Sequence, residues 1–199
     1  VTRSDFNQGH RITSNFGFDF QWNENISTKI GLFYEGAESR PYSFTYRDGR
    51  DLLNDDSRDN ALMYVPADAT EITLEDSNSS GSTNDEWMTL DAIISGDEYL
   101  SSRRGQYAER NGTQGPWSHV IDLRVAQDFS INVGNKKHTF QATFDIFNFT
   151  NFLNKEWGNR NFASSNVQIL QTATAGPDPV FRVLDSGINN IKQIDDRGI

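Results

Sequence analysis

The feature that most constrains this chain is a run of alternating apolar and polar residues. It lies at residues 138–149 and reads HTFQATFDIFNF. Alternation with a period of two is typical of an extended strand with one apolar and one polar face. The apolar face carries Phe140, Ala142, Phe144 and Ile146. The polar face carries Thr139, Gln141, Thr143 and Asp145.

Three further segments repeat this alternation, at residues 11–22, 26–36 and 118–131. The polar turn Asn23-Glu24-Asn25 joins the first two into a predicted hairpin. At about 3.3 Å per residue each of its strands spans about 33 Å, and a tilt of about 40° reduces the height to about 25 Å. This is the height of the apolar band of an outer-membrane barrel, whereas strands of soluble proteins are commonly about half as long.

The connections between the predicted strands alternate between short and very long. The long ones, residues 37–117 and 150–197, are expected to be extracellular loops, because such barrels have short turns at one end and long loops at the other. From Ala37 to Trp117 there are sixteen acidic residues and seven arginines. Within these connections we expect extended segments at Arg40–Tyr46 and Val180–Leu184, a helix capped by Asn84 or Asp85 up to about Ser95, and a second helix at Asp97–Gln106.

Composition excludes several classes of protein. The net charge of −10 argues against nucleic acid as a partner, since phosphate binding needs a basic surface. The chain has no cysteine and no run of about 18 apolar residues, so neither a disulfide framework nor a membrane helix is expected. We find no motif of a nucleophilic or phosphate-binding enzyme, and we predict no catalytic residue and no cofactor.

Some polar residues are candidates for local sites. The acidic segment 48–59 is a weak candidate for calcium, although its spacing does not match an EF-hand loop; its carboxylates are Asp48, Asp51, Asp55, Asp56 and Asp59. The three histidines, His10, His119 and His138, are too far apart in sequence to predict a metal site. Asn148, Asn151 and Asn154 are expected to form turns after the last long strand.

The two faces of the predicted sheet have separate candidates. On the polar face, which would line the lumen of a barrel, charged residues could contact a substrate, although pairing with neighbours is the simpler expectation: they are Asp19, Lys29, Glu35, Asp122, Arg124 and Asp145. Near the strand ends, aromatic residues are placed as in the girdles of membrane barrels: they are Trp22, Tyr34, Trp117 and Phe129.

Several motifs, in order, resemble the late barrel strands of TonB-dependent outer-membrane receptors of the Oar-like and SusC-related type found in Bacteroidota. The most specific is FDIFNFTNFLNKEWG at residues 144–158. The others are GLFYEG (31–36), RPYS (40–43), YVP (64–66), RGQYAERNG (104–112), PWSH (116–119), DLR (122–124) and QDF (127–129). The resemblance extends from about His10 to Phe162.

This resemblance implies a barrel of about 22 strands with an N-terminal plug, driven by the TonB complex. Residues 1–199 would be a partial all-β, antiparallel transmembrane barrel domain in the outer membrane of a Gram-negative cell, without the plug. Its partners would be the rest of the receptor, the TonB complex through the missing N-terminal part, lipid and a surface lipoprotein. The family ends in a further strand, which would begin near Asp195.

The expected function is import of a bulky nutrient such as a glycan, a peptide or a siderophore-like compound. Two alternatives remain open at this point. A soluble extracellular β-sandwich could bind carbohydrate through the aromatic residues of the long loop. A secreted β-rich hydrolase would need two carboxylates across a cleft, which the sequence does not locate.

Overall fold

The computed structural model describes residues 3–7, 9–47, 52–53, 56–79, 81–159 and 164–184. These residues are mostly β, with antiparallel sheets. The chain divides into two compact units. Unit 1 consists of Val1–Asn7, Ser39–Pro116 and Phe162–Ile199, and unit 2 consists of Gln8–Glu38 and Trp117–Asn161.

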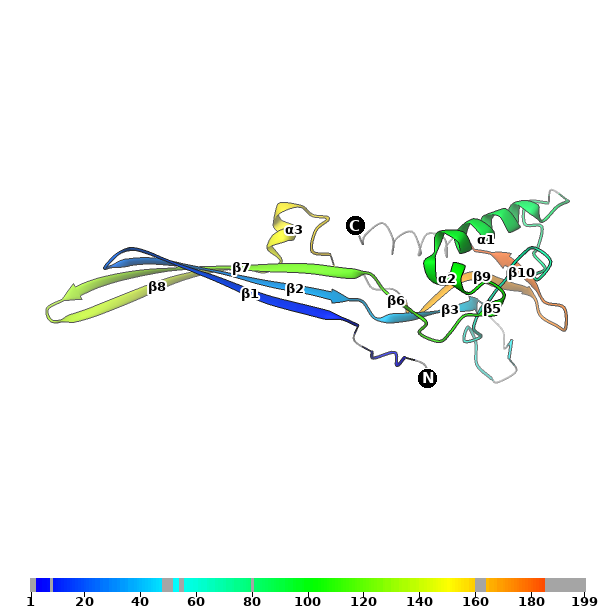
Figure 1. Ribbon diagram of the computed structural model, residues 1–199, viewed down its shortest axis with the longest axis horizontal. Coiled ribbons are helices and arrows are strands. Elements are labelled where there is room, and N and C mark those ends of the chain that lie inside the picture. Colours follow the sequence, from blue (N-terminus) through cyan, green and yellow to red (C-terminus); the bar gives the residue numbers. More distant parts are fainter. Residues whose placement is uncertain are drawn as a thin grey trace. The chain divides into compact units, whose positions relative to one another are not determined.

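Unit 2 is built on one sheet of four long antiparallel strands in the order β1-β2-β7-β8 (Figure 1). The strands are β1 (Arg11–Asn23), β2 (Ile26–Glu38), β7 (Trp117–Val133) and β8 (Lys136–Ile146). The four long strands predicted from the alternation are confirmed, and three of them are slightly longer than expected. Strands β1 and β8 are the two edges of this sheet.

Both hairpins of this sheet close with two-residue turns. Glu24 and Asn25 join β1 to β2, and Gly134 and Asn135 join β7 to β8. Gly134 has a φ of 62°, the left-handed conformation that tight hairpin turns require and that glycine adopts without strain. The register of β7 and β8 is unbroken from the turn onward, whereas that of β1 and β2 shifts by one residue between Gln21 and Asn23 and is then constant to Arg11.

The predicted strand at residues 138–149 ends earlier than expected. Strand β8 stops at Ile146, and the short helix α3 (Phe149–Leu153) follows. Asn148 has a φ of 54°, and its backbone N–H donates to Oδ1 of Asp122 at 2.7 Å, so the alternating pattern cannot continue as a strand. Its side-chain Nδ2 donates to the carbonyl of Gly158 at 3.0 Å, which confirms a turn-forming role for this asparagine.

The long connections are not irregular loops, because most of their described residues, 39–116 with its gaps and 164–184, belong to the folded unit 1. Its main sheet has the order β10-β9-β3-β6 and contains one parallel pair, β3 with β9. Its strands are β3 (Pro41–Arg47), β6 (Thr113–Gln114), β9 (Asn166–Thr174) and β10 (Val180–Val183), and a smaller pair is formed by β4 (Tyr64–Val65) and β5 (Gln106–Tyr107). The extended segments expected at Arg40–Tyr46 and Val180–Leu184 are confirmed.

Both predicted helices exist, with different ends. Helix α1 (Asn84–Gly96) is preceded by Thr83 as its N-cap, not by Asn84 or Asp85, and Thr83 makes no side-chain capping bond. Helix α2 (Glu98–Ser102) is shorter than the expected Asp97–Gln106, and Oδ1 of Asp97 accepts from the N–H of Leu100 at 2.7 Å. The carboxylate at this N-terminus satisfies a backbone donor that the helix itself cannot.

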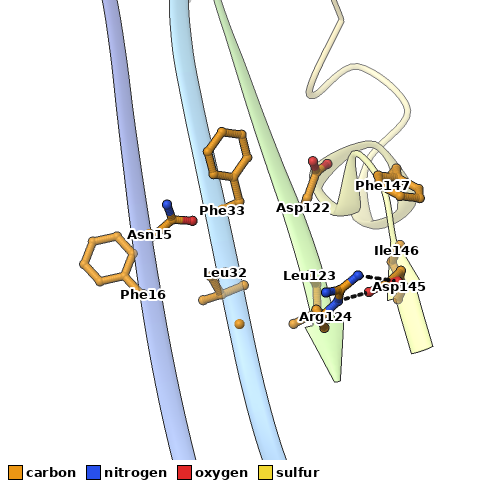
Figure 2. A pocket seen from close by; sticks show the side chains of 11 residues that line it. Asn15, Phe16, Leu32, Phe33, Asp122, Leu123, Arg124, Asp145, Ile146 and Phe147 are labelled. Atoms are coloured by element: carbon orange, nitrogen blue, oxygen red, sulfur yellow. Dashed lines mark hydrogen bonds and ion pairs between the residues drawn. The ribbon is translucent and has the colours of Figure 1, made fainter. Parts of the chain in front are cut away.

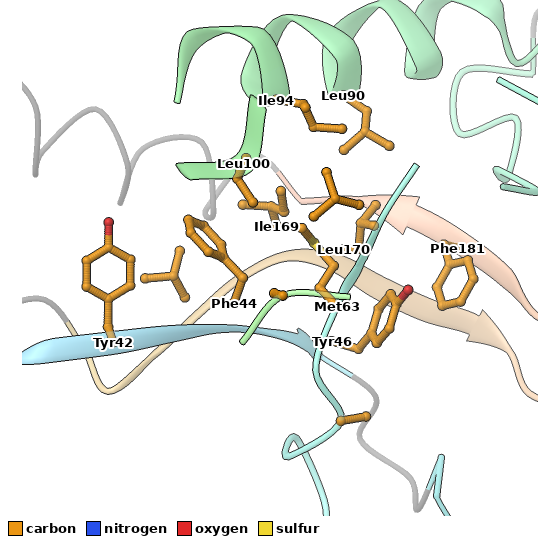
Figure 3. Packing of buried hydrophobic residues seen from close by; sticks show 14 of the residues in the cluster. Tyr42, Phe44, Tyr46, Met63, Leu90, Ile94, Leu100, Ile169, Leu170 and Phe181 are labelled. Carbon is orange, nitrogen blue, oxygen red and sulfur yellow. The ribbon is translucent and has the colours of Figure 1, made fainter. Parts of the chain in front are cut away.

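The core of unit 1 lies between these helices and its main sheet (Figure 3). Leu90 and Ile94 of α1 and Leu100 of α2 are fully buried. Phe44 packs its ring parallel to Tyr99 with the centroids 6.0 Å apart. The other fully buried apolar side chains of this core are Met63, Val65, Val167, Ile169 and Leu170.

One core tyrosine makes the free energy of unfolding of unit 1 decrease with pH in the alkaline range. Burial raises the pKa of Tyr46 to about 12, while its hydroxyl accepts from the N–H of Tyr64 at 3.1 Å. The unfolded tyrosine loses its proton near pH 10, so stability is complete below that pH and falls by about 2 kcal/mol as pH rises towards 12. Tyr46→Phe is expected to flatten this loss, measured as the free energy of unfolding against pH. An equally steep loss of stability in the variant would contradict the attribution of this loss to the ionisation of Tyr46.

Candidate functional site

The apolar face of the unit 2 sheet is exposed. Side chains align across all four strands in rows, of which Phe18, Ile30, Val125 and Phe144 form one. Phe18 on one edge strand is 53% exposed and Phe144 on the other is 64% exposed. The next row contains Phe16, Leu32, Leu123 and Ile146. An apolar surface that runs across a whole sheet marks a surface that contacts something other than water.

At the turn end of this face, polar groups accompany the rings. Trp22 donates from Nε1 to Oγ1 of Thr28 at 2.7 Å, and the Thr28 hydroxyl donates to Oε1 of Gln127 at 2.6 Å. Gln127, which interrupts the apolar pattern of β7, therefore has a partner on the neighbouring strand. Phe129 lies in the adjacent row, between Ile26 and Phe140.

At the opposite end, three aromatic side chains form a second group. The hydroxyl of Tyr34 lies 2.8 Å from Nδ1 of His119, and the Trp117 ring stacks on His119 with the centroids 6.2 Å apart. The aromatic residues predicted near the strand ends thus lie at both ends of the exposed apolar band. Three of them, Trp22, Tyr34 and Trp117, have polar tips that suit a boundary between apolar and aqueous surroundings.

The polar face is held together by charge pairs between neighbouring strands. Nζ of Lys29 lies 2.9 Å from Oδ2 of Asp128, and the carboxylate also accepts from Nε2 of Gln141 at 2.7 Å. Arg11 and Glu35 are joined at 2.6 Å. The cations of these two pairs are half exposed, while the carboxylates are only 14–15% exposed. Because the cations remain in water, such pairs contribute modest stability and mainly keep this face hydrophilic.

The six charged residues predicted to face the lumen all lie on this polar face. Arg124 binds Asp145 through two hydrogen bonds, of 2.6 and 2.9 Å (Figure 2). Asp122 accepts from Asn148, and Asp19 is the register partner of Lys29. Cross-strand pairing or a turn contact therefore accounts for most of these charges.

A hollow of about 290 Å³ lies against the middle of the sheet. The register places Gly17, Gly31, Arg124 and Asp145 in one row of the polar face. Gly31 lines the hollow, and a Cβ there would make only an ordinary contact with the Cβ of Arg124 at 3.8 Å. A Cβ on Gly17, next to it in the row, would meet nothing within 4 Å, so this part of the face is open. Around it lie Asn15, Phe33, Asp122 and Phe147 (Figure 2). Sequence reasoning missed this hollow, although both glycines stand at polar-face positions.

The remaining sequence candidates do not come together. Asp48, Asp51 and Asp55 of the acidic segment lie outside the described residues. Among the residues described, no group of three or more His, Cys, Asp or Glu side chains is placed to hold a metal ion. His10 lies 3.1 Å from Oε2 of Glu38, and His138 is the register partner of Ile131.

The other two asparagines after β8 stabilise the same turn region as Asn148. Asn151 donates from Nδ2 to the carbonyls of Lys155 and Trp157, at 3.0 and 3.1 Å. Asn154 follows the last residue of α3 and accepts from the N–H of Glu156 through Oδ1 at 3.0 Å. The predicted turn-forming role of the three asparagines is confirmed.

Comparison with known proteins gives no assignment. No protein-family model matches the chain, and neither a curated protein nor a solved structure matches it. None of the described helices has the length and apolar character needed to cross a membrane.

Proposed function

We propose that this chain forms part of the barrel wall of a TonB-dependent outer-membrane receptor that imports a bulky nutrient. The observation that carries the proposal is the four-stranded sheet with one exposed apolar face and one charged, hydrogen-bonded face. In a barrel wall the apolar face contacts lipid and the polar face lines the aqueous interior. The motif order from about His10 to Phe162 supports the same family.

The exposed apolar face supports lipid contact on energetic grounds. Ten large apolar side chains of this face are exposed by about half or more: Ile12, Phe16, Phe18, Phe20, Trp22, Phe129, Ile131, Val133, Phe140 and Phe144. Fully burying an exposed side chain of this size contributes about 1.5–3 kcal/mol, and about half of that remains to be gained for each of these half-exposed side chains. Ten of them together favour an apolar environment. A bilayer supplies that environment without a further protein layer.

The strand connections agree with the same role. Two-residue turns close both hairpins at one end of the sheet, and the long connection at the other end folds into unit 1. Barrel strands of this kind have short periplasmic turns and long extracellular segments, so unit 1 would belong to the outer surface of the receptor. The hollow over Gly31 would then provide room for the plug or the nutrient.

The alternative, a soluble carbohydrate-binding β-sandwich, needs a second sheet over the apolar face. Within the part of unit 2 that the structure describes, the strands belong to a single sheet. The exposed rings would have to be covered by residues outside that part. The barrel wall requires no such cover.

Heat-modifiability of the full-length protein tests the proposal. A closed barrel resists dodecyl sulfate until it is boiled, so the unboiled protein from outer-membrane fractions is expected to migrate differently from the boiled one. The 199-residue chain alone is expected to show no shift, because a sheet with two free edges cannot close. A full-length protein that is found in the soluble fraction and shows no shift would refute the barrel and favour the sandwich.

A further inference from the structure

In unit 1, the segment before helix α1 has the residue pattern of a calcium-binding loop. Residues 76–81 read DSNSSG. An EF-hand loop has an acidic first residue, Asp or Asn at its third position, and a glycine at its sixth, where the chain turns sharply. Asp76, Asn78 and Gly81 occupy these three positions.

The backbone has the sharp turn for which this glycine is needed. Gly81 has a φ of +80°, a conformation that other residues adopt only with strain. Its N–H donates to Oδ2 of Asp76 at 2.6 Å, so the first and sixth positions of the loop are held together. A Cβ at this position would meet nothing within 4 Å, and the requirement for glycine is therefore conformational.

A buried carboxylate oxygen points to a ligand at this loop. Glu86, in the first turn of α1, is only 6% exposed. Its Oε1 accepts from the N–H and the hydroxyl of Ser77, at 3.0 and 2.7 Å, which places the carboxylate against the loop. Its other oxygen, Oε2, is buried and has no hydrogen-bond partner among the described residues.

The charge around Glu86 is negative. A glutamate carboxylate carries a negative charge at neutral pH, and the carboxylate of Asp76 is close enough to add to it. No Lys, Arg or His occurs between residues 71 and 102. Arg182 reaches the segment from β10, but it is bound to Glu75 at 2.6 Å. A buried charged oxygen with no partner costs free energy unless a cation meets it.

We propose that the described residues 76–79 and 81–86 form a calcium site in which Asp76, Asn78 and Glu86 supply side-chain oxygens. Calcium takes six to eight oxygen ligands, so main-chain carbonyls and water complete the set. This donor set contains two carboxylates and otherwise neutral oxygens. It therefore differs from the metal-binding groups of three or more His, Cys, Asp or Glu side chains, none of which is found among the described residues. It also differs from an EF-hand loop, because the acidic residue supplied by the helix stands at the eleventh position and Trp87 stands at the twelfth.

The test is calcium titration of the full-length protein after removal of metal with a chelator, followed by calorimetry. One saturable site with a Kd on the order of 10⁻⁴ to 10⁻³ M is expected, as in extracellular calcium modules. Glu86→Gln is expected to raise the Kd about tenfold or more, because the number of charged ligands tunes affinity. The matched control is Glu98→Gln, the same substitution in the first turn of α2, which should leave the Kd unchanged. Magnesium should bind more weakly, since it demands a regular octahedral shell.

A second variant covers the case in which Glu86→Gln disturbs the fold, as judged by circular dichroism. Asn78 is exposed, so Asn78→Ala is expected to leave the fold intact and to weaken calcium binding. Absence of saturable calcium binding in the unaltered protein would overturn the proposal. Binding that is equally tight in the unaltered protein and in a folded variant of Glu86 or Asn78 would overturn it as well.

Discussion

Phe144→Arg is expected to destabilise the membrane-inserted receptor by about 2–4 kcal/mol, the cost of a charged side chain on the lipid face near the bilayer midplane. Phe144 is 64% exposed on the apolar face, in the same row as Phe18, Ile30 and Val125. In lipid, the guanidinium would replace a ring that the acyl chains solvate. Urea-dependent unfolding of the full-length protein from phospholipid vesicles, followed by tryptophan fluorescence, measures this difference.

Thr143→Arg is the matched control for this change. Thr143 is the next residue on the same strand, its side chain is on the polar face, and it is the register partner of Ala126. The charge introduced there remains in water, so we expect a much smaller loss of stability. Equal sensitivity of the two positions would mean that both faces have the same surroundings and would argue against the barrel wall.

Phe44→Ala is expected to destabilise unit 1 by about 3–5 kcal/mol, because it removes a large buried ring and leaves a cavity. Phe44 is fully buried, and its ring packs against those of Tyr99 and Tyr42, with centroid distances of 6.0 and 5.6 Å. The effect does not depend on the membrane role of unit 2. Chemical denaturation of the full-length protein, read out by proteolysis within residues 39–116, measures it.

The same substitution at an exposed site provides the control. Phe6 also belongs to unit 1, but 82% of its surface is exposed. Phe6→Ala is therefore expected to change the free energy of unfolding by less than about 0.5 kcal/mol, as for ordinary surface positions. Equally small effects of Phe44→Ala and Phe6→Ala would contradict the core described here.

The long strands could be predicted from sequence because each carries its own signal. The period of two between Arg11 and Trp22 defines both a strand and its two faces without knowledge of its neighbours. The same signal failed after Ile146, where Phe147, Asn148 and Phe149 continue the alternation by residue type. The left-handed conformation of Asn148 and its bond to Asp122 end the strand there, and both depend on a contact made across 26 residues.

The core of unit 1 could not be predicted because its pieces are short and distant in sequence. Met63 and Val65 are buried, but a segment of this length has no periodicity to detect. Strand β3 pairs with β9 in parallel, and no local pattern specifies such a partner. The hollow on the polar face has a similar origin, because its lining residues Gly31 and Arg124 become neighbours only through the register of β2 and β7.

The pairing of β3 with β6 brings the two ends of residues 39–116 together, and this has a consequence for the order of folding. Strands β2 and β7 are neighbours in the sheet but are separated by the whole of residues 39–116. Closing so long a loop slows folding, because its entropy is lost before the pairing repays it. Inside unit 1, however, the N–H of Ser39 donates to the carbonyl of Pro116 at 3.0 Å. Once unit 1 has folded, the two ends of residues 39–116 are already together. Strands β2 and β7 can then pair as quickly as the strands of a local hairpin.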